Sequence, residues 1–306
     1  NRQRLVTSGA GTLDALIVTS TSGTYNTPLT LTTSGGSGTG AVTFVVNDDT
    51  AFGCTVTNGE LTSSSAGTCL VTATKAADSE YNAISSTATP VALGKAAQAP
   101  LSVTSTSGTY GSTLALATSG GSGIGLVTYS VSSVTATGCS ASGALLTVTG
   151  AGTCSVTAFK AADNNYNLAI SSATIVTFAK ATQATLTMTS PATALFGQTI
   201  TLASSGGSGT GAVAYGVVAG TCSLSGSDLT LGDAGSTCQV SASKQGTANY
   251  DPQTSATQTI VISKAAQTIA FTSAVPSYPV PNGTYTPTMT SISAVTGLST
   301  GITPSI

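Results

Sequence analysis

Six cysteines are the residues of this 306-residue chain most able to do covalent chemistry, and the chain contains no histidine. They fall into three close pairs: Cys54 with Cys69, Cys139 with Cys154, and Cys222 with Cys238. Six cysteines allow many connectivities, but one pair per repeated segment favours a disulfide within each pair. Two thiols per segment, without a CxxC spacing, do not make a zinc site. We therefore predict three local disulfides and an oxidising, extracytoplasmic environment.

Hydroxyl side chains are abundant, but a serine or threonine nucleophile needs a neighbouring base, and histidine is absent. A buried lysine can serve as that base. Lys75, Lys160 and Lys244 end three equivalent predicted strands. We expect each lysine to extend its charge to solvent at the end of a domain, or to pair with Asp78 or Asp163. The sequence therefore predicts no catalytic residue, no cofactor and no enzymatic activity.

Other ligand chemistries also lack their residues. The Gly/Ser-rich segment 34–40 has no P-loop lysine and precedes a predicted strand rather than a helix. The eight basic residues do not cluster and the net charge is −2, which argues against nucleic acid binding. No DxDxDG loop is present, so no calcium or other metal site is predicted. No apolar run approaches the ~20 residues of a membrane span.

The chain is organised by internal repeats. The Gly/Ser-rich segment that starts at Ser34 returns from Ser119 and from Ser205. The segment Ala66–Lys75, which contains the second cysteine of its pair, returns with the same period of about 85 residues. That period suits one β-sandwich domain of ~100 residues per repeat. The predicted divisions are an N-terminal segment 1–13, repeats 14–96, 97–181 and 182–265, and a partial repeat 266–306.

Alternation of apolar and polar residues with a period of two predicts strands with one buried face. In repeat 1 the pattern places Val42, Phe44 and Val46 inward on one strand. The strand of the second cysteine places Cys69, Val71 and Ala73 inward, and Val91 and Leu93 do so on the strand that follows.

Turn signals separate these strands. Asn58-Gly59 predicts a tight hairpin, and Ser142-Gly143 and Ser225-Gly226 are its expected equivalents. The loops after the cysteine strands each carry a tyrosine, which we expect to cover the end of its own sandwich; these are Tyr81, Tyr166 and Tyr250. The fold prediction is all-β: tandem immunoglobulin-like β-sandwiches with one intradomain disulfide each, plus a partial C-terminal domain.

The joints between repeats are short and of nearly constant length. A lysine, then one or two alanines, leads to Gln98, Gln183 and Gln267 in the three joints. Such joints differ from flexible Gly/Ser linkers, so a semi-rigid rod is expected.

The two ends of the chain depart from the repeat pattern. Residues 5–13 are similar to the segment 146–154, with Leu13 in place of the cysteine, and residues 266–306 begin like a fourth repeat. We hypothesise that the N-terminal segment of one molecule completes the C-terminal half-domain of the next, since incomplete sandwiches expose strand edges. The expected intersubunit contacts are Leu5, Val6, Leu13, Ile269 and Phe271. The alternative is that the chain is an excerpt of a longer repeat array.

The Ser-Gly-Gly-Ser-Gly loop, the AGTC-x-VTA-x-K strand and the K-A-x-Q joint resemble those of bacterial tandem immunoglobulin-like repeat proteins of the cell surface. The resemblance covers roughly residues 14–275 and implies a stalk, an adhesin or a surface fibre. The first functional interpretation is an extracellular structural protein that forms or belongs to a surface filament, with copies of itself as partners. The alternatives are an adhesin stalk that reaches a host or neighbouring cell through a domain outside this segment, and an array of carbohydrate-binding modules.

Overall fold

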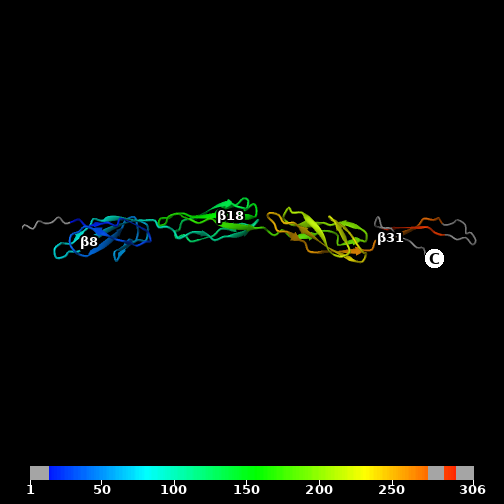
Figure 1. Cartoon of the computed structure of the whole chain (residues 1–306), viewed down its shortest axis with the longest axis horizontal. Coiled ribbons are helices and arrows are strands. Elements are labelled where there is room, and N and C mark those ends of the chain that lie inside the picture. Colours follow the sequence, from blue (N-terminus) through cyan, green and yellow to red (C-terminus); the bar gives the residue numbers. More distant parts are fainter. Residues whose placement is uncertain (1–13, 275–285, 294–306) are drawn as a thin grey trace, which may run out of the picture. The chain divides into compact units, whose positions relative to one another are not determined.

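The computed structural model describes residues 14–274 and 286–293 of the chain (Figure 1). The elements of this part are β-strands, and no helix in it is long and apolar enough to cross a membrane. The chain divides into two compact units. The described residues of unit 1 are 14–108, 113–147 and 153–177, and unit 2 contains 109–112, 148–152 and the described residues from 178 onward.

Repeat 1 lies in unit 1 and contains ten strands. These are β1 (Ile17–Val18), β2 (Ser22–Thr24), β3 (Leu29–Thr30), β4 (Thr33–Ser34), β5 (Val42–Asp48), β6 (Thr55–Thr57), β7 (Glu60–Thr62), β8 (Gly67–Lys75), β9 (Ile84–Ser85) and β10 (Thr89–Gly94). One sheet has the order β2-β10-β8-β5, with β9 also paired to β8. A second sheet has the order β3-β7-β6, and β1 pairs with β4. Strand β2 runs parallel to β10, while the other neighbours in these sheets are antiparallel.

Strand β8 supplies the centre of the repeat 1 core (Figure 1). Its inward residues Cys69, Val71 and Ala73 have no exposed surface, as the alternation predicted. Val91 and Leu93 of β10 lie beside them, and Leu61 of β7 contributes from the opposite sheet. Two sheets packed face to face over one apolar core make a β-sandwich.

The predicted disulfides are present, and each joins the two sheets of its repeat. In repeat 1, Cys54 directly precedes β6 of the three-stranded sheet, whereas Cys69 belongs to β8 of the five-stranded sheet. Their Cα atoms are 6.0 Å apart, and 15 residues separate them in sequence. The bond therefore fixes the two faces of the core against each other.

Repeat 2 has the same strand order. Its strands are β11 (Ser102–Val103), β12 (Ser107–Thr109), β13 (Leu114–Ala115), β14 (Thr118–Ser119), β15 (Val127–Ser133), β16 (Ser140–Ser142), β17 (Leu145–Thr147), β18 (Gly152–Lys160), β19 (Ala169–Ile170) and β20 (Thr174–Ala179). The sheets are β12-β20-β18-β15, with β19 on β18, then β13-β17-β16, and the pair β11-β14. Its disulfide joins Cys139 to Cys154.

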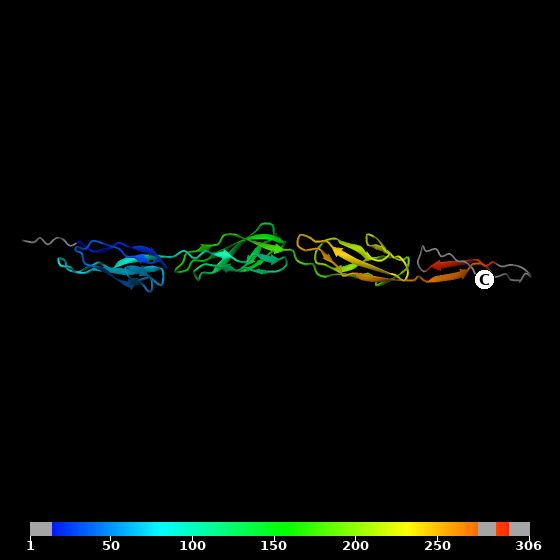
Figure 2. The same cartoon turned by 60° about the horizontal axis from the view of Figure 1, so that its bottom comes forward.

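Repeat 3 lies in unit 2 and repeats this arrangement a third time. Its strands are β21 (Leu186–Met188), β22 (Thr193–Leu195), β23 (Thr199–Thr201), β24 (Ser204–Gly206), β25 (Val213–Ala219), β26 (Ser223–Ser225), β27 (Asp228–Thr230), β28 (Thr237–Lys244), β29 (Gln253–Thr254) and β30 (Gln258–Ser263). After it, β31 (Gln267–Phe271) and β32 (Met289–Ser293) form an antiparallel pair, drawn in orange and red in Figure 2.

The disulfide of repeat 3 joins Cys222 to Cys238 across one additional residue. The inserted serine before Cys238 makes the sequence separation 16 rather than 15, yet the two Cα atoms are 6.1 Å apart, as in repeat 2. Cys238 lies on β28 and has no exposed surface, like Val240 and Ala242 of the same strand. The extra residue is therefore taken up by the turn before β28, and the cysteine keeps its place in the core.

Two details of the sequence prediction were wrong. Val42 was expected inward but is 37% exposed, and its equivalent Val213 is 39% exposed. Each is the first residue of an edge strand. Val42 pairs with Lys75 and Val213 with Lys244, the last residues of the neighbouring strands. Only one neighbouring strand covers them there. Phe44 is half-buried against the core, as predicted.

The hairpin turns also differ among the repeats. Asn58 and Gly59 both have positive φ, 53° and 81°, as a type I′ turn requires. In the other repeats the two-residue turns are 143–144 and 226–227, one residue later than predicted. Only their first residue, a glycine, has positive φ, which fits a type II′ turn.

We expect replacement of both Cys139 and Cys154 by alanine to destabilise repeat 2 by about 3 kcal/mol, because the loss of the cross-link frees a loop of this length in the unfolded state. Calorimetry should show a lower melting temperature for that repeat, with the transitions of repeats 1 and 3 nearly unchanged. Identical melting of the wild-type chain with and without reductant would contradict this structural role.

Candidate functional site

The loop 163–167 of repeat 2 lies at the joint with repeat 1, and both sides of this joint belong to unit 1. Tyr166 was expected to cover its own sandwich. Instead its ring packs edge-on against Tyr25 of repeat 1, with ring centroids 5.6 Å apart and planes at 84°. This geometry is favourable for two aromatic rings. The prediction for Tyr166 was therefore wrong, because this ring covers an adjoining domain.

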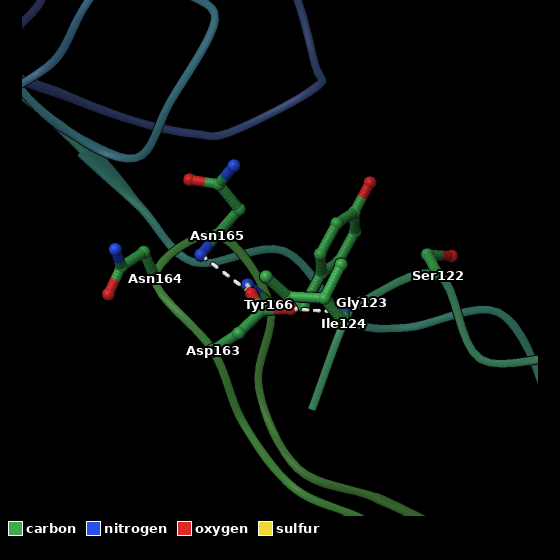
Figure 3. A pocket seen from close by; sticks show the side chains of 7 residues that line it. All are labelled: Ser122, Gly123, Ile124, Asp163, Asn164, Asn165 and Tyr166. Carbon is green, nitrogen blue, oxygen red and sulfur yellow. Dashed lines mark hydrogen bonds between the residues drawn. The ribbon is translucent and has the colours of Figure 1, made fainter. Parts of the chain in front are cut away.

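Asp163 holds this loop in shape. Its carboxylate accepts hydrogen bonds from the backbone N–H groups of Ile124, at 2.7 Å, Asn165, at 2.8 Å, and Tyr166, at 2.9 Å. The bonds to Ile124 and Asn165 are visible in Figure 3. Gly123 makes this possible, because a Cβ atom there would collide with the Asp163 carboxylate.

The same hydrogen bonds lower the pKa values of the loop carboxyl groups. The N–H of Ile124 is the main cause of the lowered pKa of Asp163. In repeat 1, the N–H groups of Glu80, Thr39 and Tyr81 lower the pKa of Asp78 from 3.8 to about 2. In repeat 3 the loop begins with Thr247 instead of an aspartate. Its hydroxyl accepts hydrogen bonds from the backbone N–H groups of Asn249 and Tyr250.

Main-chain groups of repeat 1 find their partners in this loop. Ala96 donates its N–H to the carbonyl of Asn165 and accepts from the N–H of Asn167, both at 2.9 Å. The N–H of Ala66, directly before β8, donates to the Asn165 side-chain oxygen at 3.0 Å. Since a buried N–H or C=O without a partner is costly, these bonds tie the end of repeat 1 to the loop.

Two polar side chains of the linking segment complete the joint. The amide N–H₂ of Gln98 donates to the carbonyls of Ala161, at 3.2 Å, and Asn167, at 2.8 Å, while its oxygen accepts from Gly123 at 3.2 Å. Lys95 donates from its ammonium group to the Asp163 carbonyl at 2.5 Å. These hydrogen bonds attach the segment between the repeats to repeat 2 at two positions, Lys95 and Gln98.

Unit 2 contains a second set of the same contacts. Tyr250 packs edge-on against Tyr110 at 5.5 Å, and the Asn249 side chain accepts from the N–H of Ala151 at 2.9 Å. Gln183, only 4% exposed, donates to the carbonyl of Asp251 at 2.8 Å. The joint is therefore a repeated feature of the chain, like the disulfide.

The strand-end lysines bind the Gly/Ser loops. Lys75 donates to the carbonyl of Gly36 at 2.9 Å, and Lys160 donates to that of Gly121 at 3.2 Å. The expected pairing with Asp78 or Asp163 is wrong, because those carboxylates are held by backbone N–H groups. The Gly/Ser loop connects β4 to β5, and so precedes a strand as predicted.

An open pocket of about 320 Å³ lies beside the loop, and Figure 3 shows its lining. Its lining residues are Ser122, Gly123, Ile124, Asp163, Asn164, Asn165 and Tyr166. Asp163 accepts three backbone hydrogen bonds there, which hold it as part of the loop. Within the described residues, no group of three or more metal-ligating side chains occurs. The arrangement fits a structural joint.

Of the residues expected to make intersubunit contacts, the structure describes two. Leu5, Val6 and Leu13 lie outside the described residues. Ile269 and Phe271 of β31 are 57% and 70% exposed, and β31 pairs only with β32 among the described strands. They lie on one face of this two-stranded sheet.

Sequence reasoning missed the residues that the loop of the following repeat contacts. Tyr25 and Tyr110 recur with the repeat period, as do Ala66 and Ala151. That recurrence was the available signal. Each tyrosine, however, packs against a residue about 140 positions later, and each alanine bonds to one about 100 positions later, so the pairing depends on the three-dimensional contact. Gln98 and Gln183 also recur with the repeat period, but the sequence does not indicate which groups they bond to.

No protein-family model matches the chain, and comparison with curated proteins finds no match. Among solved structures, Drosophila N-cadherin EC1-4 is 11% identical over 82% of this chain and 75% of that chain, with a TM-score of 0.29. A Bacteroides ovatus surface protein, SGBP-B of a mixed-linkage glucan utilization locus, solved with a mixed-linkage heptasaccharide, is 14% identical over 87% of this chain and 75% of that one, with a TM-score of 0.18.

The strand pairing defines the class of protein. The chain is an all-β protein of tandem immunoglobulin-like sandwiches, with a disulfide in each of its three complete repeats. Disulfides repeated in this way fit an extracellular location.

We expect Asn165→Ala to expose the Ala66 N–H, because it removes the oxygen that accepts this hydrogen bond. Hydrogen exchange at the Ala66 amide should become roughly fivefold faster, as loss of a bond worth ~1 kcal/mol implies. Asn164→Ala is the matched control, since Asn164 is exposed. Equal exchange in the two variants would contradict the role of Asn165.

Asp78 should titrate with a pKa near 2 in a carboxyl-detected NMR titration. Because the folded-state pKa lies below the ordinary value, the ionised carboxylate stabilises the loop above that value. This stability is lost as the pH falls from 3.8 towards 2. The stability difference between the wild type and Asp78→Asn should therefore shrink over that window. A difference that stays constant with pH would show that the carboxylate does not hold the loop.

Proposed function

We propose that this chain is an extracellular structural protein whose tandem β-sandwiches form, or belong to, a cell-surface filament. The observation that supports this most strongly is the joint. The same tyrosine pair, asparagine bond and glutamine bonds occur twice in the chain. Domains coupled through repeated hydrogen bonds transmit tension and resist bending better than domains on free linkers.

The disulfides serve the same role inside each repeat. Residues Cys54 and Cys69 close the core between two sheets, so that pulling on the ends does not separate the sheets easily. The core is small and consists mainly of leucine and valine around the two cysteines, which makes the cross-link a large part of its stability. The proposal assigns no catalytic step and no cofactor to the chain.

End-to-end assembly is the part of the proposal that concerns β31 and β32. Among the described strands β31 and β32 pair only with each other, and two strands alone are marginally stable in water. Phe271 and Ile269 are exposed on it, and Ile292 on the other strand is 64% exposed. We propose that residues 1–13 of a second molecule add to this sheet and cover these side chains, with Leu5, Val6 and Leu13 as the apolar contacts.

Electron microscopy of the purified chain tests this assignment. The wild type should form long regular fibres, whereas a variant lacking residues 1–13 and the double variant Ile269→Ser, Phe271→Ser should not. Phe52→Ser is the control, because Phe52 is an apolar side chain in repeat 1 that is 69% exposed.

Other outcomes would favour the alternatives. Separate single molecules in the wild-type sample would favour an adhesin stalk, and fibres that persist without residues 1–13 would overturn strand addition. Binding of glycans by a single repeat would favour the carbohydrate-binding alternative.

A further inference from the structure

Strand β15 has a free edge. It is the last strand in the order β12-β20-β18-β15, and no other described strand pairs with its outer side. Leu126 and Val134 flank the strand. The Leu126 carbonyl accepts from the N–H of Ala161 at 2.9 Å, and the N–H of Val134 donates to the Thr153 carbonyl at 3.0 Å, both on the β18 side. Hydrogen bonds alternate along an antiparallel strand, so the odd-numbered residues between them, including Tyr129 and Val131, direct N–H and C=O away from the sheet.

The equivalent strands of the other repeats are protected. Strand β5 ends at Asp48, which Asp49 follows, and charged residues discourage the pairing of edges. Strand β25 has an irregular register between Val217 and Ala219, which interrupts a regular edge. Strand β15 pairs with β18 without interruption, and no charged residue occurs from Ala96 to Phe159. This edge alone of the three lacks a device against pairing.

We propose that β15 pairs antiparallel with β15 of a second copy of this chain, about a two-fold axis at Ser130. Side-by-side association goes beyond the end-to-end assembly proposed above. In this register Tyr129 lies opposite Val131 of the second copy, and these residues exchange the free main-chain hydrogen bonds. The hydrogen-bonding alternation permits this register, because the odd-numbered residues face each other across the axis.

The outer face of the strand is self-complementary in the same register. Leu126 is 75% exposed and Val134 is 57% exposed, and small polar residues separate them. The two-fold axis places Leu126 opposite Val134 of the second copy, and does so twice. Exposed apolar side chains become cross-strand neighbours, which stabilises a paired edge. The equivalent positions in the other repeats are Ala41 with Asp49 and Ala212 with Gly220.

A second copy is therefore the occupant that this edge fits. The strand is uncharged, so two copies meet without like-charge repulsion. On its exposed face, apolar residues lie at both ends and small polar residues at the centre, and this pattern matches itself when reversed. The pairing would join two five-stranded sheets into one continuous sheet.

Cross-linking of the full chain tests this register. In the proposed pair, residue 130 lies opposite itself at a non-hydrogen-bonded position, where Cα atoms are ~4.5 Å apart, within reach of a disulfide. Ser130→Cys should give a covalent dimer on a non-reducing gel. Val45→Cys, at the equivalent exposed position of β5, should give none. Because the readout depends on the contact at residue 130, it is separate from fibre formation.

Sedimentation of charged variants supplies the second readout. Ser130→Lys places two ammonium groups opposite each other and should weaken side-by-side association by roughly tenfold, since like charges across a strand pair repel. Val45→Lys should leave it unchanged. Equal cross-linking of the two cysteine variants, or unchanged association of Ser130→Lys, would overturn the proposal.

Discussion

Backbone groups at the end of a β-sandwich must find hydrogen-bonding partners, and in this chain the loop of the following repeat supplies them. Ala66 and Ala96 of repeat 1 bond to the main chain and side chains of residues 165–167. A backbone N–H or C=O satisfied in this way loses its partner if the repeats separate. This requirement links the stability of the domain end to its neighbour, and it explains why the linking segment has a nearly constant length.

The remaining features of the joint serve this constraint. Asp163 uses its carboxylate to hold the loop in the conformation that presents Asn165 and Tyr166. Gly123 allows the carboxylate to approach, and Gln98 bonds the linking segment to Asn167 of the loop and to Gly123. The tyrosine pair adds apolar contact at the side. Repeat 3 has the equivalent Asn249 and Tyr250, but its loop begins with Thr247 instead of an aspartate. The same contacts therefore form although a different side chain holds the loop.

Local signals in the sequence predicted the fold well. The cysteine pairs, the inward Val71 and Ala73, and the Asn58-Gly59 turn depend on residues close in sequence, whose alternation and backbone preferences are readable directly. The joint was not predictable in the same way. Tyr166 looks like a side chain that covers its own domain, because nothing within its own repeat points to Tyr25. Likewise, the sequence suggests a lysine as the partner of Asp163, because it does not show which backbone N–H groups the fold brings near the carboxylate.

Distance measurement between two spin labels tests the central claim most directly. With labels at Val45 in repeat 1 and Leu145 in repeat 2, both exposed, the full chain should give one narrow distance distribution. The double variant Asn165→Ala, Tyr166→Ala should give a broad one, since it removes both the side-chain bond and the ring contact. A broad distribution in the wild-type chain would contradict the account, because it would show that the contacts do not hold the two repeats together.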